Sequence, residues 1–367
     1  MTPIDAIVVW RAIEPQGACM SFQKDNREYE AWLATQCDVV KKDIKEKRHQ
    51  MKKSAFIFLR ATYFRWAGQI GKLCPELMDA PQVLAVGDLH LENFGTWRDA
   101  DGRLVWGVND FDEAATMPYP LDLVRLAASI RLADLPVSNQ AATAALLRGY
   151  HEGLAQPQPA LLDEGETWLR PYAVDTEERS KKFWKKVDGY SKAKLPREIT
   201  SPLIASLPKH AENIRFASRV AGIGSLGRPR YVAVAFWQGG RVLREAKALV
   251  PSAWIWAHGG KSGSSHFLAL ANGKYRAPDP FLEVRDKFIF RRIAADSRKI
   301  ELVDAGGSIR VNVLQAMGFD LASIHAAGAP GASALRADLK KRPHGWLNSA
   351  AKTAVAAVKR DFEEWRN

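Results

Sequence analysis

Apolar residues in the first part of the chain recur either at helical spacing or in short continuous runs. Between residues 54 and 70 they return every three or four positions, which predicts a helix. The run at residues 83–86 (VLAV) predicts a buried strand that ends just before Asp88. Turn residues at positions 99–102 separate two strand-like runs and predict a hairpin, and a helix is predicted after Pro120.

The second half of the chain changes from helical to strand-like patterning. Residues 155–210 are rich in proline and charge and predict helices separated by loops. The runs 231–237 (YVAVAFW) and 241–246 (RVLREA) flank Gln-Gly-Gly and predict a second hairpin. Residues 256–265 (WAHGGKSGSS) predict a flexible loop, and residues 287–293 (KFIFRRI) a further strand. The Ala-rich C-terminal stretch predicts helices.

The composition narrows the class of protein. Hydrophobic residues make up 47% and charged residues 26% of 367 positions, as in a globular protein with room for two lobes. No run of about eighteen apolar residues occurs, so no membrane span is predicted, and the first residues lack a signal-peptide pattern. The three cysteines include no CxxC pair and favour reduced thiols over disulfides or a zinc site. A cytoplasmic location is therefore expected.

The chain is basic, with 53 Lys and Arg against 41 Asp and Glu, a net charge of +12. Such a surface favours anionic partners such as nucleotides, nucleic acids or acidic lipids. The excess is concentrated at residues 41–53 and 181–194, where Phe183, Trp184 and Tyr190 are interleaved with lysines. Basic residues with aromatics can bind nucleic acid, but a solvated helix face is the simpler interpretation, because no nucleic-acid-binding motif is present.

Two short segments carry the residue types of a magnesium site. Residues 87–95 (GDLHLENFG) follow the predicted buried strand, and residues 109–114 (NDFDEA) follow the predicted hairpin. Strand ends that hold carboxylates and an amide together suit Mg²⁺, which prefers hard oxygen ligands and keeps phosphates and waters as the others. Phosphoryl transfer needs such ligands and a carboxylate that orients the attacking hydroxyl.

These segments resemble the core of aminoglycoside phosphotransferases and related small-molecule kinases, whose pattern is HGDLHxxN followed by IDFxxA. The resemblance implies that Asp88 is the catalytic base, and that Asn93 and Asp110 bind the metal. It leaves two roles open for Asp112 and Glu113, which would contact the metal or support the structure. The same stretch, which contains the sequences NFG and NDFDEA, is also similar to a bacterial family of unknown function.

The sequence differs from the kinase pattern at one position near the expected catalytic base, Asp88. The histidine that the pattern places two residues before the base is Val86 here. That histidine mainly braces the loop in kinases, so the departure weakens the match modestly. His90 lies inside the motif and is interpreted as a loop-packing residue. Asp122 falls in a PxxDLA-like element whose aspartate is mostly structural, so it is given no chemical role.

A glycine-rich segment that could grip phosphates occurs late in the chain. Residues 222–227 (GIGSLG) fit GxGxxG and are followed by a predicted hairpin and Lys247. Glycines let the backbone approach phosphates, and a strand lysine adds a positive charge to them. A lone GxGxxG is weak, but its hairpin context favours a nucleotide site. The residues expected to bind the nucleotide are Gly222, Gly224, Ser225, Gly227 and Lys247.

The sequence leaves open which basic residue contacts the phosphates and which glutamate pairs with it. Arg244 lies in the same predicted strand as Lys247, and a shift of one residue turns a side chain to the other face. Lys247 is preferred. No helix glutamate can be placed opposite it with assurance, and Glu283 is the one candidate.

The order of these motifs predicts a circular permutation. The sheet with the glycines and Lys247 would come first in an ordinary kinase but follows the catalytic motifs here. Residues 318–326 (GFDLASIHA) then resemble the helix that precedes the catalytic loop, with His325 as a packing residue. Permutation is feasible where chain ends lie close together.

The sequence therefore predicts an α+β, protein-kinase-like fold with two lobes. Residues 1–205 would form N-terminal helices and the core of the helical lobe, residues 206–305 the nucleotide-gripping β-rich lobe, and residues 306–367 helices that complete the helical lobe. The expected function is ATP- and Mg²⁺-dependent phosphoryl transfer to an unidentified hydroxyl acceptor. Nucleotidyl transfer, an idle pseudokinase and a nucleic-acid-binding module are the alternatives. The sequence identifies neither the acceptor nor the oligomeric state.

Overall fold

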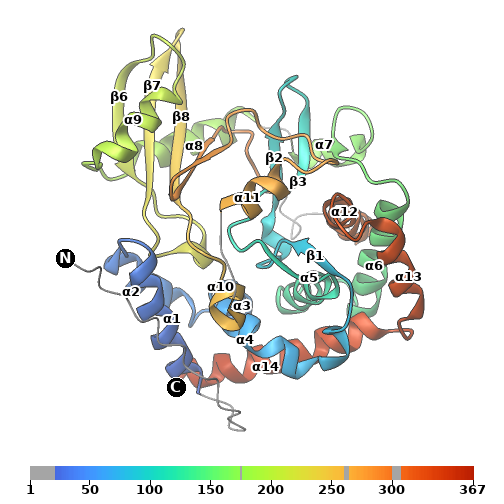
Figure 1. Ribbon diagram of the computed structural model, residues 1–367. Helices are drawn as coiled ribbons and strands as arrows, with labels where there is room; N and C mark the ends of the chain where they lie inside the picture. The colour runs from blue at the N-terminus through green and yellow to red at the C-terminus, as the bar shows by residue number, and fades with distance from the viewer. Residues whose placement is uncertain (1–20, 174–175, 260–263, 300–306) are drawn as a thin grey trace, which may run out of the picture.

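The computed structural model describes residues 21–173, 176–259, 264–299 and 307–367 of an α+β protein (Figure 1). Its helices are α1 (Phe22–Gln36), α2 (Lys41–Gln50), α3 (Ala55–Ala61), α4 (Tyr63–Leu73), α5 (Pro120–Leu132), α6 (Asn139–Ala155), α7 (Arg170–Ala173), α8 (Glu177–Asp188), α9 (Arg197–Ala205), α10 (Ala253–His258), α11 (Ser264–Ala271), α12 (Gly307–Ala326), α13 (Ala332–Lys341) and α14 (Trp346–Arg366). Short 3-10 helices are η1 (Pro75–Leu77), η2 (Leu91–Asn93), η3 (Thr167–Leu169) and η4 (Ile223–Ser225). The strands are β1 (Gln82–Ala85), β2 (Phe94–Arg98), β3 (Leu104–Val108), β4 (Ala115–Pro118), β5 (Ala160–Leu161), β6 (Glu212–Ser218), β7 (Arg230–Trp237), β8 (Gly240–Ala248), β9 (Glu283–Arg285) and β10 (Phe288–Arg292).

The largest sheet is antiparallel, in the order β6-β7-β8-β10-β9, and extends away from the helical body (Figure 1). In its register, Lys247 lies opposite Arg230, and Glu245 lies opposite both Val232 and Arg291. Because strand side chains alternate between faces, these residues share one face. Val187 of α8 packs on this face, whereas Leu203 of α9 packs on the other.

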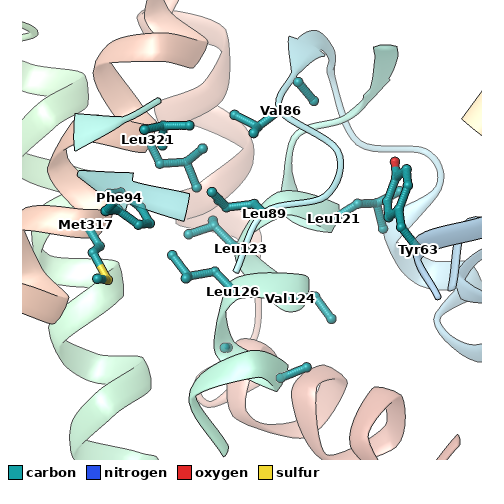
Figure 2. Close-up of a cluster of buried hydrophobic side chains, with 14 of the residues drawn as sticks. Tyr63, Val86, Leu89, Phe94, Leu121, Leu123, Val124, Leu126, Met317 and Leu321 are labelled. Carbon is teal, nitrogen blue, oxygen red and sulfur yellow. The ribbon is translucent and has the colours of Figure 1, made fainter. Parts of the chain in front are cut away.

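The helical body surrounds two smaller sheets, β1-β4 and β2-β3-β5. Helix α12 packs along α6 and also contacts β1 and β3, while α14 packs against α5. Between β1 and η2 the chain forms a loop whose Val86 and Leu89 are buried in the hydrophobic cluster of Figure 2, together with Leu123 of α5 and Leu321 of α12. This packing fixes the backbone on both sides of Asp88.

The segment between β8 and β9 does not extend the sheet. Helix α10 packs against α4, and His258 of α10 lies 2.9 Å from the Ala67 carbonyl oxygen through its Nε2 atom. Helix α11 contacts β1 and β9. Helix α10 therefore lies against the first helices of the body, and α11 lies between β1 of the body and β9 of the large sheet.

Most of the predicted elements form, with two differences. The strands, the two hairpins and the helix after Pro120 are confirmed. The helix expected at residues 54–70 is instead two helices that meet at Thr62, whose Oγ1 donates to the Phe58 carbonyl oxygen at 2.7 Å. The loop expected at residues 256–265 is partly helical, since α10 continues to His258; residues 260–263 lie outside the described residues.

The first and last described helices meet. The Phe22 amide donates to Glu364 Oε2 at 3.1 Å, and the Phe22 and Trp365 rings pack edge to face with centroids 5.5 Å apart. Cys37 and Cys74 are free thiols, and Cys19 lies outside the described residues. Within the described ranges, no helix has the length and apolar character that a membrane crossing needs.

Candidate functional site

A cleft of about 440 Å³ lies between the large sheet and the helical body. The residues that the sequence singled out come to it from two distant parts of the chain. Asp88, Asn93, Asp110 and Asp112 line it from the body, and residues 222–225 line it from the sheet side.

Asp88 lies in the loop after β1 and is held by a buried arginine. Arg125 of α5 donates from Nε to Asp88 Oδ1 at 3.0 Å and from Nη2 to the same oxygen at 2.5 Å. The guanidinium is fully buried and stacks over the rings of Tyr63 and Trp66, at 4.8 and 5.2 Å from their centroids. Burial raises the pKa of Asp88 above its ordinary value, although Arg125 opposes this effect. The carboxylate thus has a fixed orientation and increased basicity.

The backbone before Asp88 is fixed by Asp122, which lies at the start of α5. Asp122 accepts hydrogen bonds from the amides of Val86 at 2.7 Å and Gly87 at 2.9 Å. It also lies 3.1 Å from His325 Nε2, and His325 Nδ1 lies 2.8 Å from the Tyr150 hydroxyl. The structural role expected for Asp122 is confirmed. His325 joins α12 to this network in addition to packing.

Asn93, at the end of η2, is positioned by the loop that it closes. Its Nδ2 donates to the Asp88 carbonyl oxygen at 2.7 Å, and its Oδ1 has no donor among the described residues. His90 caps η2, because its Nδ1 accepts from the Glu92 amide at 3.1 Å. Burial, and then Arg60, lower the pKa of His90 well below its ordinary value, so His90 is neutral and structural.

Asp110 and Asp112 face Lys247. The Lys247 Nζ donates to Asp110 Oδ2 at 3.0 Å and to Oδ1 at 3.2 Å, and forms a close ion pair with Asp112. Burial raises the pKa of Asp110, but Lys247 and Arg291 lower it more, so that it falls far below its ordinary value. Burial and the neighbouring Asp110 raise the pKa of Asp112 to about 6. The two carboxyl groups therefore differ strongly in acidity.

Glu113 has a structural position. Its Oε1 accepts from Arg228 Nη2 at 2.5 Å, and its Oε2 accepts from the Ala253 amide at 2.6 Å, in the first turn of α10. The Ser252 hydroxyl also donates to the Glu113 carbonyl oxygen at 2.9 Å. Of the two roles left open by the sequence, Glu113 has the supporting one.

The donor set suits a magnesium ion that also binds phosphates. Asp112 is nine-tenths buried, and neither of its carboxylate oxygens accepts a well-aligned hydrogen bond within the described part of the chain. The Asp112 carboxylate, which is paired with Lys247 and lies 3.5 Å from Arg228, and the free amide oxygen of Asn93 are hard oxygen ligands beside Asp110. Over the same residues, no three His, Cys, Asp or Glu side chains form a metal cluster by themselves. Phosphates and waters would therefore have to supply the other ligands.

The glycine segment connects β6 to β7 and lies directly over Asp88. A Cβ atom on Gly224 would be 3.1 Å from Asp88 Oδ2 and 3.0 Å from the Arg60 carbonyl oxygen. Gly227 has φ +97°, and a Cβ there would be 2.3 Å from Ile44 Cδ1. The amides of Ser225 and Leu226 donate within the loop, to the Gly222 and Ile223 carbonyl oxygens, so this conformation does not present them to a ligand.

Arg244 and Lys247 lie on opposite faces of the large sheet, and only Lys247 is on the face that meets Asp110 and Asp112. Arg244 lies on the face opposite Lys247, where it donates to the Ser206 carbonyl oxygen and stacks over Phe281. Glu283 lies on β9 and accepts from Arg285 at 3.0 Å. Lys247 therefore points toward the cleft from behind Asp110 and Asp112, which line it and are its partners, and neither Lys247 nor Gly227 lines the cleft itself.

Several residues of the site were not predicted. Arg125 and Arg228 are buried partners of Asp88 and of Glu113. Lys47 of α2 is also buried, and its Nζ donates to the Gly224 carbonyl oxygen at 3.3 Å. Burial, followed by the charge of Arg228, lowers the pKa of Lys47 to about 8. One signal could have identified Lys47: it falls three positions after Ile44, at helical spacing, within an otherwise charged stretch.

The aromatic residues of the second basic stretch are used in packing. Phe183, Trp184 and Tyr190 are partly buried against the cluster formed by α8 and the large sheet. Arg241 stacks over Trp184, with its guanidinium carbon 4.3 Å from the ring centroid. These rings are therefore less available for base stacking than the sequence suggested.

Residues 39–156 match a family described as an uncharacterized protein conserved in bacteria (DUF2252). The matched stretch contains Lys47, Asp88, Asn93, Asp110 and Asp112, and ends before the glycine segment. The similarity to a bacterial family of unknown function expected from the sequence is thus found. No curated protein and no solved structure matches the chain.

Proposed function

We propose that the protein is an ATP- and Mg²⁺-dependent phosphotransferase that acts on a hydroxyl acceptor. The observation that carries the proposal is the meeting of Asp110 and Lys247, 137 positions apart, beside a cleft that Asp88, Asn93, Asp110 and residues 222–225 line. Phosphoryl transfer needs these parts: a base, metal ligands and positive charge for the phosphates.

In this proposal Asp88 accepts or orients the proton of the acceptor hydroxyl. Arg125 keeps the carboxylate aimed into the cleft. Asn93, Asp110 and Asp112 would hold Mg²⁺, which neutralises phosphate charge when bound. Lys247 lies within reach of both aspartates, so its ammonium is positioned to contact phosphates held beside them. Catalysis would come mainly from positioning and charge neutralisation.

The nucleotide also needs a surface for its base. Apolar side chains line part of the cleft at Val108, Phe111, Phe267, Leu282 and Ile293. Flat apolar walls with a few polar groups are typical of small-molecule sites. We assign the base of ATP to this part of the cleft.

We further infer that the chain is a circularly permuted kinase-like fold. The order β6, glycine segment, β7 and β8 with Lys247 supports a nucleotide-gripping lobe that follows the catalytic motifs in the sequence. The contact between Phe22 and Glu364 supports the permutation, because the first and last described helices lie close enough to be joined without moving the fold. In this interpretation the boundaries stay at residues 205 and 305, the second of which lies outside the described residues, and α10 and α11 bridge the lobes.

The proposal is tested first by thermal unfolding with and without ATP and Mg²⁺. A ligand that binds only the folded state raises the midpoint. ATP should raise the midpoint of the wild type only when Mg²⁺ is present, and Asp110→Ala should lose this shift. Asp188→Asn, on an exposed carboxylate of α8 that pairs with Arg241, is the matched control and should keep it. No shift in the wild type at millimolar ATP would reject the nucleotide site.

Turnover separates an enzyme from an idle nucleotide-binding protein. The atypical partners of Lys247 favour the idle alternative, and the retained Asp88, Asn93 and Asp110 favour catalysis. With a panel of sugars, amino alcohols, lipid headgroups and proteins, Asp88→Asn should abolish product while ATP binding persists. Analysis of the product's mass distinguishes a transferred phosphoryl group from a transferred nucleotidyl group.

A further inference from the structure

A cluster of charged side chains lies on the large-sheet side of the cleft, beside Lys247. Glu245 is fully buried and lies two residues before Lys247 on the same face of β8. Arg291 binds it through Nε at 2.8 Å and Nη2 at 2.7 Å, Arg219 forms a closer ion pair, and the Nη1 of Arg230 lies 3.5 Å away. Arg291 comes from β10, Arg230 from β7 and Arg219 from the position just after β6, so the cluster ties these strands to β8, which carries Glu245.

The cluster carries more positive charge than its carboxylate can balance. Three guanidinium groups against one carboxylate leave a formal charge of +2, and all three arginines line the cleft. Arg230 is 6% exposed, and burial lowers its pKa even with Glu245 nearby. Asp110 near Arg291 and Asp112 near Arg230 offset part of this charge, but these two carboxylates are themselves paired with Lys247, so an anion that enters the cleft would still be stabilised here.

The geometry selects a phosphate group. Arginine presents a rigid fork of donors that matches phosphate oxygens, and its charge does not titrate in the physiological range. Two residues along a strand correspond to about 7 Å, so the cluster and Lys247 are separated by a distance that a chain of phosphates can span. Arg230 Nη2 also donates to Ser225 Oγ of the glycine segment at 2.8 Å, which places the cluster next to the same loop.

We propose that Arg219, Arg230 and Arg291 form a second anion subsite, which takes a phosphate group other than the one beside Asp110 and Lys247. The subsite rests on the proposed function, since it belongs to the same cleft. Two sources have the required chemistry: another phosphate of the bound nucleotide, or the phosphate of a phosphorylated acceptor.

Calorimetric titration of the full chain with tripolyphosphate, at constant ionic strength and without Mg²⁺, tests phosphate binding in the cleft without a nucleoside, and the arginine variants isolate the contribution of the subsite. Arg291→Gln should weaken tripolyphosphate binding at least tenfold. Glu245→Gln removes the competing carboxylate and should tighten it at least fivefold. Arg241→Gln, on the same sheet but paired with Asp188, is the matched control and should change nothing. If Glu245→Gln fails to fold, Arg291→Gln and Arg219→Gln decide the question.

The two sources give different results. If the nucleotide supplies the phosphate, Arg291→Gln weakens ATP binding as much as tripolyphosphate binding and leaves adenosine binding unchanged. If the acceptor supplies it, ATP binding is unchanged, and inorganic phosphate binds the ATP-saturated wild type but not Arg291→Gln.

The cluster is purely structural if Arg291→Gln and Arg219→Gln leave the binding of tripolyphosphate, ATP and phosphate unchanged, and that result overturns the subsite. Failure of the proposed function is distinct: tripolyphosphate then binds and responds to these variants, whereas ATP with Mg²⁺ gives no more binding than tripolyphosphate and Asp110→Ala has no effect.

Discussion

Lys247 and Asp110 meet at 3.0 Å between Nζ and Oδ2, although 137 positions separate them in the chain. The lysine side chain is 2% exposed, and it also forms an ion pair with Asp112. It is therefore the counter-ion of two neighbouring carboxyl groups and, with the Arg228–Glu113 pair, a direct link between the large sheet and the helical body.

Lys247→Met should lower the free energy of unfolding by about 3 kcal/mol, because it leaves the buried Asp112 carboxylate and the partly exposed Asp110 carboxylate without their cation. Adding Asp110→Asn should recover part of this loss, with a coupling of more than about 1 kcal/mol in a double-mutant cycle. Urea unfolding of the four proteins measures both quantities. Lys186→Met, an exposed lysine at the same cleft, should change stability little. Additive effects would show that the ion pair does not stabilise the fold.

Arg125→Leu should destabilise the protein more than Asp88→Asn. The first change leaves the largely buried Asp88 carboxylate without its donor, at a cost of about 3 kcal/mol or more. Asp88→Asn keeps a carbonyl oxygen for Arg125 and should cost less. Urea unfolding compares the two. Arg60→Gln breaks a partly exposed pair with Glu92 and should cost less than about 1 kcal/mol. Equal losses in the first two variants would contradict a positioning role for Arg125.

Gly224→Ala should impair function more than stability. The added methyl group would lie 3.1 Å from Asp88 Oδ2, so either the loop or the carboxylate must shift by a few tenths of an ångström. We expect a loss of ATP-dependent stabilisation or turnover of about tenfold or more, since small displacements at a reacting group are costly. Gly240→Ala, whose Cβ would have no neighbour closer than 3.9 Å, is the control for a glycine outside the cleft. Wild-type behaviour of Gly224→Ala would show that this close approach has no functional role.

The sequence predicted those parts of the site that local patterns encode. Asp88, Asn93 and Asp110 stand at the ends of predicted strands, and the hairpin that carries Lys247 was recognisable from its turn. The preference for Lys247 over Arg244 needed only the alternation of a strand, once its register was known.

The unpredicted residues owe their roles to packing between distant segments. Arg125 looks like an ordinary basic residue on an apolar helix, and only the approach of α5 to the loop after β1 makes it the partner of Asp88. Lys47 belongs to a stretch whose other lysines are exposed. Its burial depends on the contact of α2 with the glycine segment, where the Val40 amide also donates to the Gly227 carbonyl oxygen at 2.9 Å. The spacing from Ile44 indicates that Lys47 is buried, but no periodicity within either segment identifies the residues that Arg125 and Lys47 contact.

Lys47 should make the stability of the protein depend on pH in the alkaline range. Burial lowers the pKa of Lys47 to about 8 in the folded protein, against an ordinary value of 10.5. Between these values the unfolded chain binds more protons than the folded one, so this lysine makes stability increase as pH rises from about 8 to about 10.5. Below about pH 8 both states are protonated, and the full cost of burying the charge is present.

Lys47→Met should remove this dependence. The variant's free energy of unfolding, relative to the wild type, should be greatest below pH 8 and fall by roughly 2 to 3 kcal/mol as the pH approaches 10.5. Urea unfolding at half-unit pH steps measures the difference. Lys45→Met, at an exposed position of the same helix, should reproduce the wild-type curve. A constant difference between Lys47→Met and the wild type from pH 7 to pH 10.5 would mean that Lys47 titrates normally, and that its contact with the Gly224 carbonyl oxygen does not keep the charge buried.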